Sequence, residues 1–253
     1  MTMDKQVRTF SLLDDLYQVA AEQFAGIVNQ AVKSRGEASV ALAGGGTPQR
    51  LFQRLAQPPY PASIPWHAIH FYWGDERCVP PDNPESNFGQ VKKLLLDRVP
   101  VRSENVHRVQ GELPLEIAVE DYRRCLAQHG SSDQPWPQLD YSLMGMGADG
   151  HTASLFPGKE NPEEAFSPVM SVSADYLDRP AERVTLTPMV FNTSRNVVFL
   201  VTGSDKAAIL AAVLDGPDDP IHLPAQRIQP ASGTLTWIVD ASAARLINVR
   251  RQV

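Results

Sequence analysis

Apolar residues recur along the chain with two periods, and the alternation between them predicts the elements of the fold. From residue 11 to 34 they form one broad stripe at helical spacing: Leu12, Leu16, Val19, Phe24, Ile27, Val28 and Ala31. Arg35-Gly36 ends this helix. The mostly apolar run Ser39-Val40-Ala41-Leu42-Ala43 then predicts a short strand in a sheet that is buried on both faces. A second helix is predicted over 49–56, after Pro48 at a first-turn position.

The same alternation continues through the rest of the chain. Further strands are predicted over 69–73, 139–144, 169–173, 183–186, 196–201 and 235–239. Further helices are predicted over 88–96, 112–128, 188–192 and 204–214, the last capped by Ser204, and a short helix follows the last strand. A long loop is predicted over 74–87. Because strands alternate with helices throughout, we expect an α/β fold: a single domain, residues 1–253, with a mainly parallel, Rossmann-like sheet flanked by helices on both faces.

Composition and charge narrow the class of protein. Of the 253 residues, 43% are hydrophobic, which is enough for a sizeable buried core. The formal net charge of −6 provides no overall basic surface for nucleic acid, so an anionic substrate would need local positive charge. No apolar run reaches the roughly 18 residues of a membrane helix. Met1-Thr2-Met3-Asp4-Lys5 lacks the apolar core of a signal peptide, and we expect a cytoplasmic protein without membrane partners.

Cysteines and histidines show no spacing that is typical of a metal site. Cys78 and Cys125 form no C-x-x-C pair, and we interpret them as idle thiols in a reducing compartment. Histidines outside the glycine-rich segment described next are scattered along the chain: His67, His70, His107, His129 and His222. His70 lies in an apolar strand and is interpreted as a core residue. The sequence therefore predicts no metal.

The most informative segment is 143–152, where an apolar strand runs into glycines that carry Asp149 and His151 on one turn. Residues 145–150 satisfy the dinucleotide pattern G-x-G-x-x-G, but Pro157-Gly158 interrupts the long helix that such a site requires. Two interpretations stay open. One is a plain structural turn in which the acid is a helix cap and the histidine faces solvent. The other is an acid–base site at the carboxyl edge of the sheet.

Two further glycine turns lie between a strand and a helix. Consecutive amides in Gly44-Gly45-Gly46-Thr47, together with the hydroxyl, are typical of an anion cradle, and a tight turn is the alternative. Gly203-Ser204-Asp205-Lys206 repeats this arrangement. A lysine in a first helical turn opposes the helix dipole, so Lys206 is either a ligand for an anion or a plain surface residue.

Charged residues also follow the predicted strand 69–73, at the end where α/β sheets bind ligands. In Gly74-Asp75-Glu76-Arg77, Arg77 is suited to a phosphate, a carboxylate or an oxyanion, and Asp75 to sugar hydroxyls. A local ion network is the alternative, above all for Glu76. Arg183, at the start of another strand, is a candidate second positive charge.

Four motifs stand in one order along nearly the whole chain: Ala43-Gly44-Gly45-Gly46-Thr47-Pro48; Trp73-Gly74-Asp75-Glu76-Arg77 with Pro84-Glu85-Ser86-Asn87; Gly145-Met146-Gly147-Ala148-Asp149-Gly150-His151-Thr152-Ala153-Ser154-Leu155-Phe156-Pro157; and Gly203-Ser204-Asp205-Lys206. Together they closely resemble the glucosamine-6-phosphate isomerase/6-phosphogluconolactonase family, and its lactonase branch in particular. The resemblance implies a phosphosugar-binding α/β fold and a monomer. It also implies hydrolysis of 6-phospho-glucono-1,5-lactone to 6-phosphogluconate in the oxidative pentose phosphate pathway, without cofactor or metal.

The resemblance also implies roles for individual residues. His151 would be the general base for the attacking water, and Asp149 would orient either His151 or the substrate. The amides of Gly44 and Gly45 would line the lactone end of the substrate or the oxyanion position, and Gly46 belongs to the same substrate-binding turn. Arg77 would stabilise negative charge near the reacting carbonyl or hold the substrate. The 6-phosphate would be held by Thr47, Arg183 and Lys206. Neither a covalent nucleophile nor a G-x-S-x-G elbow is required for an activated ester such as a lactone.

Two related functions compete with the lactonase interpretation. The deaminase branch carries a glutamate immediately before the proline of the third motif, where this chain has Phe156, and an aromatic residue where this chain has Arg77. A non-catalytic phosphosugar sensor of the same fold would have lost the histidine or the acid of the turn, and this chain retains both. These differences favour the lactonase.

Overall fold

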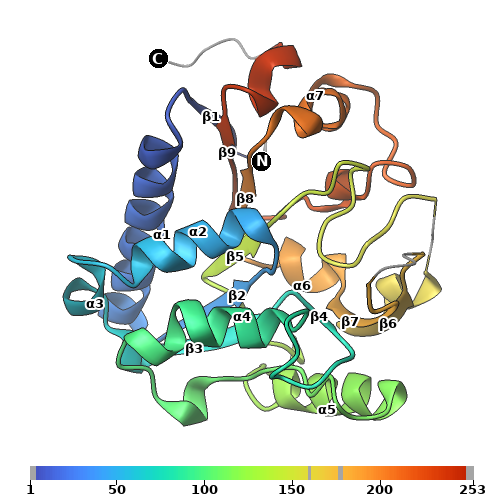
Figure 1. Ribbon diagram of the computed structural model, residues 1–253. Helices are drawn as coiled ribbons and strands as arrows, with labels where there is room; N and C mark the ends of the chain where they lie inside the picture. Colours follow the sequence, from blue (N-terminus) through green and yellow to red (C-terminus); the bar gives the residue numbers. More distant parts are fainter. Residues whose placement is uncertain (1–3, 159–160, 176–178, 249–253) are drawn as a thin grey trace.

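A six-stranded sheet forms the centre of the computed structural model, which describes residues 4–158, 161–175 and 179–248 (Figure 1). Its strand order is β1 (Asp4–Phe10), β9 (Thr234–Asp240), β8 (Asn196–Val201), β5 (Tyr141–Met144), β2 (Ala38–Leu42) and β3 (Ile69–Trp73), and every neighbouring pair is parallel. The chain runs outward from β2 to β3 and then returns to the other side of β2 as β5. At such a reversal of strand order an α/β sheet opens a crevice for ligands.

Helices flank this sheet (Figure 1). The α-helices are α1 (Leu13–Arg35), α2 (Gly46–Leu55), α3 (Tyr60–Ser63), α4 (Asn87–Leu94), α5 (Leu115–Ala127), α6 (Pro188–Asn192) and α7 (Ala207–Asp215). The 3-10 helices are η1 (Trp66–Ala68), η2 (Leu96–Arg98), η3 (Ser103–Asn105), η4 (Pro162–Ala165), η5 (Ser204–Lys206), η6 (Pro224–Arg227) and η7 (Ala243–Leu246). Within the described ranges, no helix combines the length and the apolar character that crossing a bilayer needs. The predicted α/β class is confirmed, whereas a single domain over 1–253 stays a prediction, because residues 1–3, 159–160, 176–178 and 249–253 lie outside the described part.

The hydrophobic pattern explains the best-predicted elements. The apolar stripe of α1 faces the core, and the rings of Phe24 and Tyr141 meet edge to face, with centroids 5.2 Å apart. Gly36 ends the helix at φ 86°, a left-handed conformation that glycine adopts readily, and its N–H bonds to the Val32 carbonyl. In the middle of the sheet, Phe199 of β8 stacks on Trp237 of β9.

A separate antiparallel sheet is the main difference from the predicted fold. It joins β4 (Asp75–Arg77), β7 (Glu182–Leu186) and β6 (Val169–Ser173) in the order β4-β7-β6. The strands predicted over 169–173 and 183–186 therefore exist but do not join the parallel sheet, and the loop predicted over 74–87 contains β4. Gly74 is the junction, because its N–H bonds to Leu42 in β2 while its carbonyl accepts from Leu186 in β7.

Two predictions about single elements were wrong or incomplete. The strand β1 was not predicted, because it lies at the edge of the sheet and its polar residues face solvent. Ser204 does not cap α7: it begins η5, it makes no side-chain capping bond, and Gly203 at φ 108° precedes the turn.

Three of the histidines that are scattered along the chain lie together in the fold. His70, His107 and His129 each offer a ring nitrogen, and these nitrogens lie within 4.8 Å of one another. Burial and the neighbouring imidazoles lower the pKa of His107 to about 4, and burial lowers the pKa of His70. His70 is partly buried, as expected, but it belongs to a cluster rather than standing alone in the core.

Candidate active site

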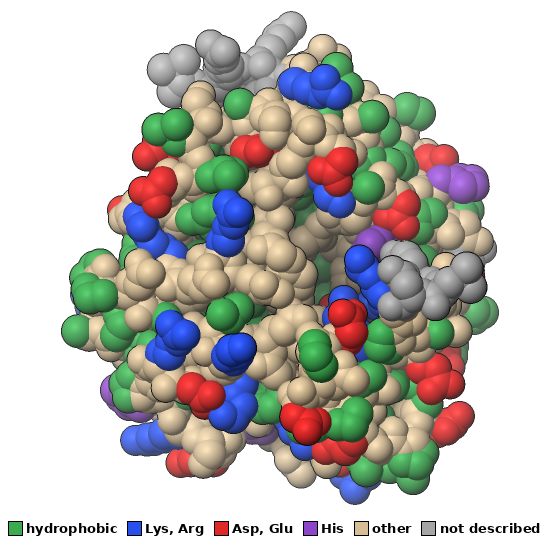
Figure 2. Space-filling view, in the orientation of Figure 1, with side chains coloured by type: hydrophobic (Ala, Val, Ile, Leu, Met, Phe, Trp, Pro, Cys, Tyr) green, Lys and Arg blue, Asp and Glu red, His purple; other side chains and the backbone are tan. Residues whose placement is uncertain are grey.

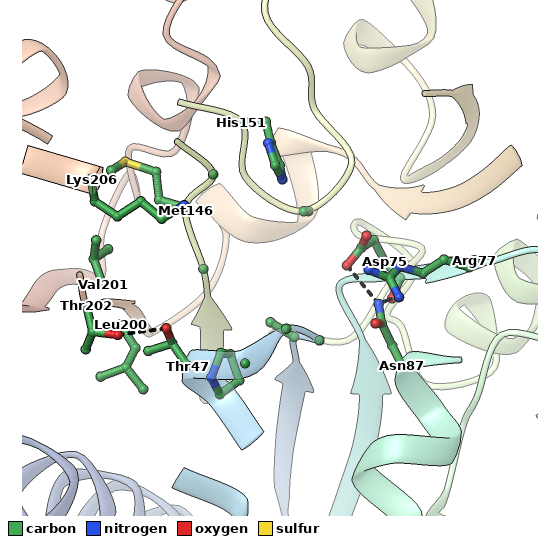
Figure 3. A pocket seen from close by; sticks show the side chains of 18 of the residues that line it. Thr47, Asp75, Arg77, Asn87, Met146, His151, Leu200, Val201, Thr202 and Lys206 are labelled. Atoms are coloured by element: carbon green, nitrogen blue, oxygen red, sulfur yellow. Dashed lines mark hydrogen bonds between the residues drawn. The ribbon is translucent and has the colours of Figure 1, made fainter. Parts of the chain in front are cut away.

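The carboxyl ends of β2, β3, β5 and β8 surround one pocket of about 250 Å³, next to the reversal of strand order (Figure 3). All the predicted site residues except Asp149 line it: Gly44, Gly45, Gly46, Thr47, Asp75, Arg77, His151, Arg183 and Lys206. Its other lining residues are Ala43, Pro48, Asn87, Gly145, Met146, Gly147, Ala153, Arg179, Leu200, Val201 and Thr202. The four sequence motifs therefore meet in space although they are far apart in the chain.

The lining of this pocket is strongly cationic. Among the residues that the structure describes, the lining contributes four basic side chains, from Arg77, Arg179, Arg183 and Lys206, and one carboxylate, from Asp75. In Figure 2 the hollow in this face of the molecule has Lys/Arg and His side chains at its edge. Because the whole chain carries a net charge of −6, this is a local concentration of positive charge, as the sequence requires for an anionic ligand.

An acid and a histidine form a pair on the turn after β5. The Nδ1 atom of His151 donates to Oδ1 of Asp149 at 2.6 Å, and the backbone N–H of His151 donates to the same oxygen at 3.1 Å. Burial acts to raise the pKa of Asp149, but the hydrogen bond and charge of His151 outweigh it and lower that pKa to about 2. Asp149 is thus ionised at neutral pH, and with Nδ1 engaged the imidazole presents Nε2. Figure 3 shows the His151 ring pointing into the pocket.

Glycine is required beneath this pair. A Cβ atom at Gly147 would lie 2.1 Å from Nδ1 of His151 and 2.5 Å from Oδ1 of Asp149. The loop is closed by a hydrogen bond from the Gly147 N–H to the His151 carbonyl and by one from the Thr152 hydroxyl to the Gly145 carbonyl. The glycines of this motif therefore allow the acid and the base to fold back over the chain.

The first glycine turn opens α2 at the floor of the pocket. Gly45 is the residue immediately before the first turn of the helix, and its φ is 96°. The Thr47 hydroxyl lies 2.9 Å from the hydroxyl of Thr202, which follows β8 (Figure 3). The first glycine turn is thus linked to the residue immediately before the second. Lys206 follows in η5, with its Nζ atom 3.4 Å from the Asp205 carboxylate.

The residues after β3 form a buried polar group on the opposite side of the pocket. Asp75 is 7% exposed, and its carboxylate accepts from the Ser154 hydroxyl at 2.7 Å. The amide of Asn87 donates to the Asp75 carbonyl at 2.9 Å, and Arg183 Nη1 lies 4.0 Å from the Asp75 carboxylate. Arg77 pairs with Arg183 across β4 and β7, so the small antiparallel sheet delivers both arginines.

Glu76 turns away from the pocket and holds the start of α4. Its carboxylate accepts the backbone N–H groups of Arg77, Asn87 and Phe88 and the hydroxyl of Ser86. Burial nevertheless raises the pKa of Glu76 to about 7. Glu76 thus belongs to a local network, but its partners named here are backbone N–H groups and a hydroxyl rather than the ions that the alternative interpretation expected.

Sequence reasoning assigned no role to three polar residues of the pocket. Asn87 stands in a quoted motif, but its bond to Asp75 becomes visible only once β4 is placed beside α4. Thr202 follows a strand that is apolar from residue 197 to 201. Arg179 lies in a segment without periodic pattern, and no signal in the sequence distinguishes it from a surface arginine.

Comparison with known proteins places these features in one family. The family model described as glucosamine-6-phosphate isomerases/6-phosphogluconolactonase matches residues 12–237. A 6-phosphogluconolactonase of Haemophilus influenzae is 37% identical over 82% of this chain and 87% of its own length. One of Rattus norvegicus is 38% identical over 85% of this chain and 83% of its own. The crystal structure of 6-phosphogluconolactonase from Thermotoga maritima superposes with a TM-score of 0.79 at 30% identity, covering 94% of this chain and 100% of that one.

Proposed function

This chain belongs to the glucosamine-6-phosphate isomerase/6-phosphogluconolactonase family, and we propose that it hydrolyses 6-phospho-D-glucono-1,5-lactone to 6-phospho-D-gluconate in the oxidative pentose phosphate pathway. The observation that carries the proposal is the pair of His151 and Asp149, joined at 2.6 Å beside a pocket lined by four basic side chains. A phosphosugar lactone needs both parts, a base for water and positive charge for the phosphate.

In the proposed mechanism His151 acts on water. Its Nε2 atom takes a proton as the water oxygen forms a bond to C1 of the lactone, and Asp149 stabilises the resulting imidazolium. Negative charge that develops on the carbonyl oxygen is stabilised by the amides of Gly44-Gly45-Gly46 and by Arg77. The bond between C1 and the ring oxygen then breaks, the ring oxygen takes up the proton, and the acid is released.

Phosphate binding gives the reaction its orientation. We assign the 6-phosphate to Thr47, Lys206 and Arg183, and Arg183 also lies 4.0 Å from the Asp75 carboxylate. Asp75 is assigned to a sugar hydroxyl. Because these contacts are made before and during the reaction, they anchor the substrate so that C1 stays within reach of the activated water.

The surroundings of His151 favour the lactonase over the deaminase. Phe156 occupies the position where the deaminase branch carries its glutamate, is 8% exposed and lies with its ring centroid 5.2 Å from that of His151. An apolar ring at this place supplies no group for proton transfer in sugar ring opening. A sensor without activity is disfavoured because the acid–histidine pair is intact.

We further propose that the protein acts as a cytoplasmic monomer and binds no nucleic acid, metal or cofactor for this reaction. The net charge of −6 and the local placement of basic groups in the pocket support a small anionic substrate rather than a polyanion. Sedimentation of the purified protein would test the oligomeric state.

Hydrolysis of freshly generated 6-phosphogluconolactone, measured against its spontaneous rate, tests the proposed function. We expect the wild type to accelerate the reaction and His151→Ala to lower kcat by about 10³-fold, the range of general acid–base catalysis. Product binding by the variant, measured by calorimetry, should be retained. A folded wild type that gives no acceleration would overturn the proposal, and glucosamine 6-phosphate would then be the next substrate to assay.

A further inference from the structure

Three histidines form a second cluster, which lies outside the pocket. His70 is on β3, His107 follows η3, and His129 follows the C-terminal end of α5. None of them lines the pocket. The ring nitrogens that face one another lie within 4.8 Å, and Nδ1 of His70 is 2.9 Å from Nε2 of His107. The ring centroids of His107 and His129 are 4.3 Å apart.

Polar groups on the outer side of the cluster indicate which nitrogen of His70 and of His129 faces inward. Nδ1 of His129 lies 3.1 Å from the Cys125 carbonyl and must carry a hydrogen there, which leaves the lone pair on Nε2. Nε2 of His70 faces the Glu37 carboxylate at 3.6 Å, which favours a hydrogen on Nε2 and a lone pair on Nδ1. A carbonyl or carboxylate behind the ring is the support that metal-ligating histidines characteristically have.

From this arrangement we propose that His70 Nδ1, His107 Nε2 and His129 Nε2 bind a zinc ion, with water as the fourth ligand. Three imidazoles and an open position suit Zn²⁺, which prefers tetrahedral nitrogen coordination. In such a site the nitrogens lie about 3.4 Å apart. The widest separation, which is within 4.8 Å, would close by up to about 1.4 Å, and the 2.9 Å between His70 Nδ1 and His107 Nε2 would open by about 0.5 Å. The exposed His129 is the ligand that moves, and its exposure also gives the ion a path from solvent.

Zinc replaces the hydrogen bond between two of the rings. In the absence of metal, Nε2–H of His107 donates to Nδ1 of His70. When the ion binds, the hydrogen of His107 moves to Nδ1 and both inward nitrogens become ligands. The charge of the ion is balanced in part by Glu37 behind His70.

The zinc ion would join three segments that meet at the edge of the sheet. His107 is already tied to β3 through the bond from its N–H to the Phe71 carbonyl, and α5 is tied to β3 through Tyr122, whose hydroxyl bonds both the N–H and the carbonyl of Trp73. Because Trp73 leads into β4, metal binding stabilises the framework that carries Arg77 without taking part in the reaction.

Calorimetric titration of the metal-free protein with Zn²⁺ tests this site. We expect one equivalent to bind, and a hundredfold excess over Kd to raise Tm by about 5 °C. His129→Ala, which removes an exposed ligand, should weaken binding more than 100-fold, and Glu37→Gln about tenfold. Both variants should retain lactone hydrolysis, which also reports that they are folded. Co²⁺ should give the visible absorption of a tetrahedral complex with wild type and not with His129→Ala.

Three histidines elsewhere in the chain provide the controls. His67→Ala and His222→Ala, which remove exposed imidazoles outside the cluster, should leave Zn²⁺ affinity unchanged. His151→Ala distinguishes the cluster from the active site. The proposal is overturned if the wild type takes up no Zn²⁺ at 100-fold molar excess, if His129→Ala binds as tightly as the wild type, or if binding is lost in His151→Ala instead.

Discussion

Two acidic residues follow strands of the sheet, Asp149 after β5 and Glu76 after β3, and their surroundings are opposite. Asp149 is half exposed, contacts a single side chain and has its pKa lowered to about 2. Glu76 is 2% exposed, is surrounded by backbone N–H donors and has its pKa raised to about 7. One carboxylate thus serves a histidine that faces the pocket, and the other holds the backbone that forms the pocket wall.

The difference between these surroundings suits Asp149 to catalysis and Glu76 to a structural role. An ionised acid that is accessible and hydrogen-bonded to an imidazole can stabilise positive charge as it forms. A buried acid that satisfies several backbone donors cannot leave them, because each unpaired N–H is costly. We therefore expect substitutions at Asp149 to change catalysis and substitutions at Glu76 to change stability.

The largest effect is expected from Glu76→Ala. The backbone N–H groups of Arg77, Asn87 and Phe88 would lose their acceptor, and we expect the free energy of unfolding to fall by about 4 kcal/mol. Urea denaturation measures this loss. Glu104→Ala, at an exposed position, is the control and should change stability by less than about 0.5 kcal/mol. Equal stability of the two variants would contradict a supporting role for Glu76.

Asp149→Asn should have the opposite profile. We expect kcat to fall about 100-fold, or about 2.7 kcal/mol, because the amide cannot stabilise the imidazolium, whereas unfolding in urea should change little. Asp219→Asn is a matched control, since Asp219 makes a similar bond to His222 at 2.9 Å outside the pocket. If both variants lose the same activity, the pair at 149 and 151 has no special role.

Lys206→Ala tests the phosphate-binding side of the pocket, and we expect a smaller effect than for Asp149→Asn. Because phosphate is held equally before and during the reaction, we expect KM to rise about tenfold with kcat nearly unchanged. Lys206→Arg should restore part of the affinity, and Lys92→Ala, at an exposed site on α4, should have no effect. A fall in kcat with unchanged KM would assign Lys206 to the transition state instead.

The sequence predicted the strands that a local hydrophobic pattern defines, but not the pairing of strands that are distant in the chain. The runs that became β3, β6 and β8 were predicted with their bounds. For β3 and β8 the reason is that buried parallel strands are mostly apolar along their length. The pairing of β6 with β7 instead of the main sheet is a tertiary property, decided at Gly74 by bonds to two different sheets. The edge strand β1 has too few apolar residues to be detected.

The two histidine sites show the same limit. His151 and Asp149 are two residues apart on one turn. The motif left open whether Asp149 contacts the histidine or the substrate, and the structure shows the contact with His151. His70 and His107 are 37 residues apart, and no spacing rule joins them to His129. Only the packing of α5 and the segment after η3 against β3 brings these three rings together.

The two carboxylates should change the stability of the protein with pH in opposite directions, because the pKa of Glu76 is raised and the pKa of Asp149 is lowered. The pKa of Glu76 is about 7 in the folded protein against an ordinary 4.5, so the folded state holds a proton that the unfolded chain releases. Its contribution to stability therefore falls as pH rises from about 4.5 to about 7. The pKa of Asp149 is about 2 against an ordinary 3.8, so its contribution falls as pH drops from about 4 to about 2.

Urea unfolding over this pH range separates the contributions of the two carboxylates to stability when the wild type is compared with Glu76→Gln and with Asp149→Asn. The difference in the free energy of unfolding between wild type and Glu76→Gln should decrease with rising pH. The corresponding difference between wild type and Asp149→Asn should decrease with falling pH. The second change should be smaller, under about 1 kcal/mol, because solvent screens a half-exposed pair. If both differences change in the same direction with pH, the two carboxylates have similar environments. That result would contradict a catalytic role for Asp149 and a structural role for Glu76.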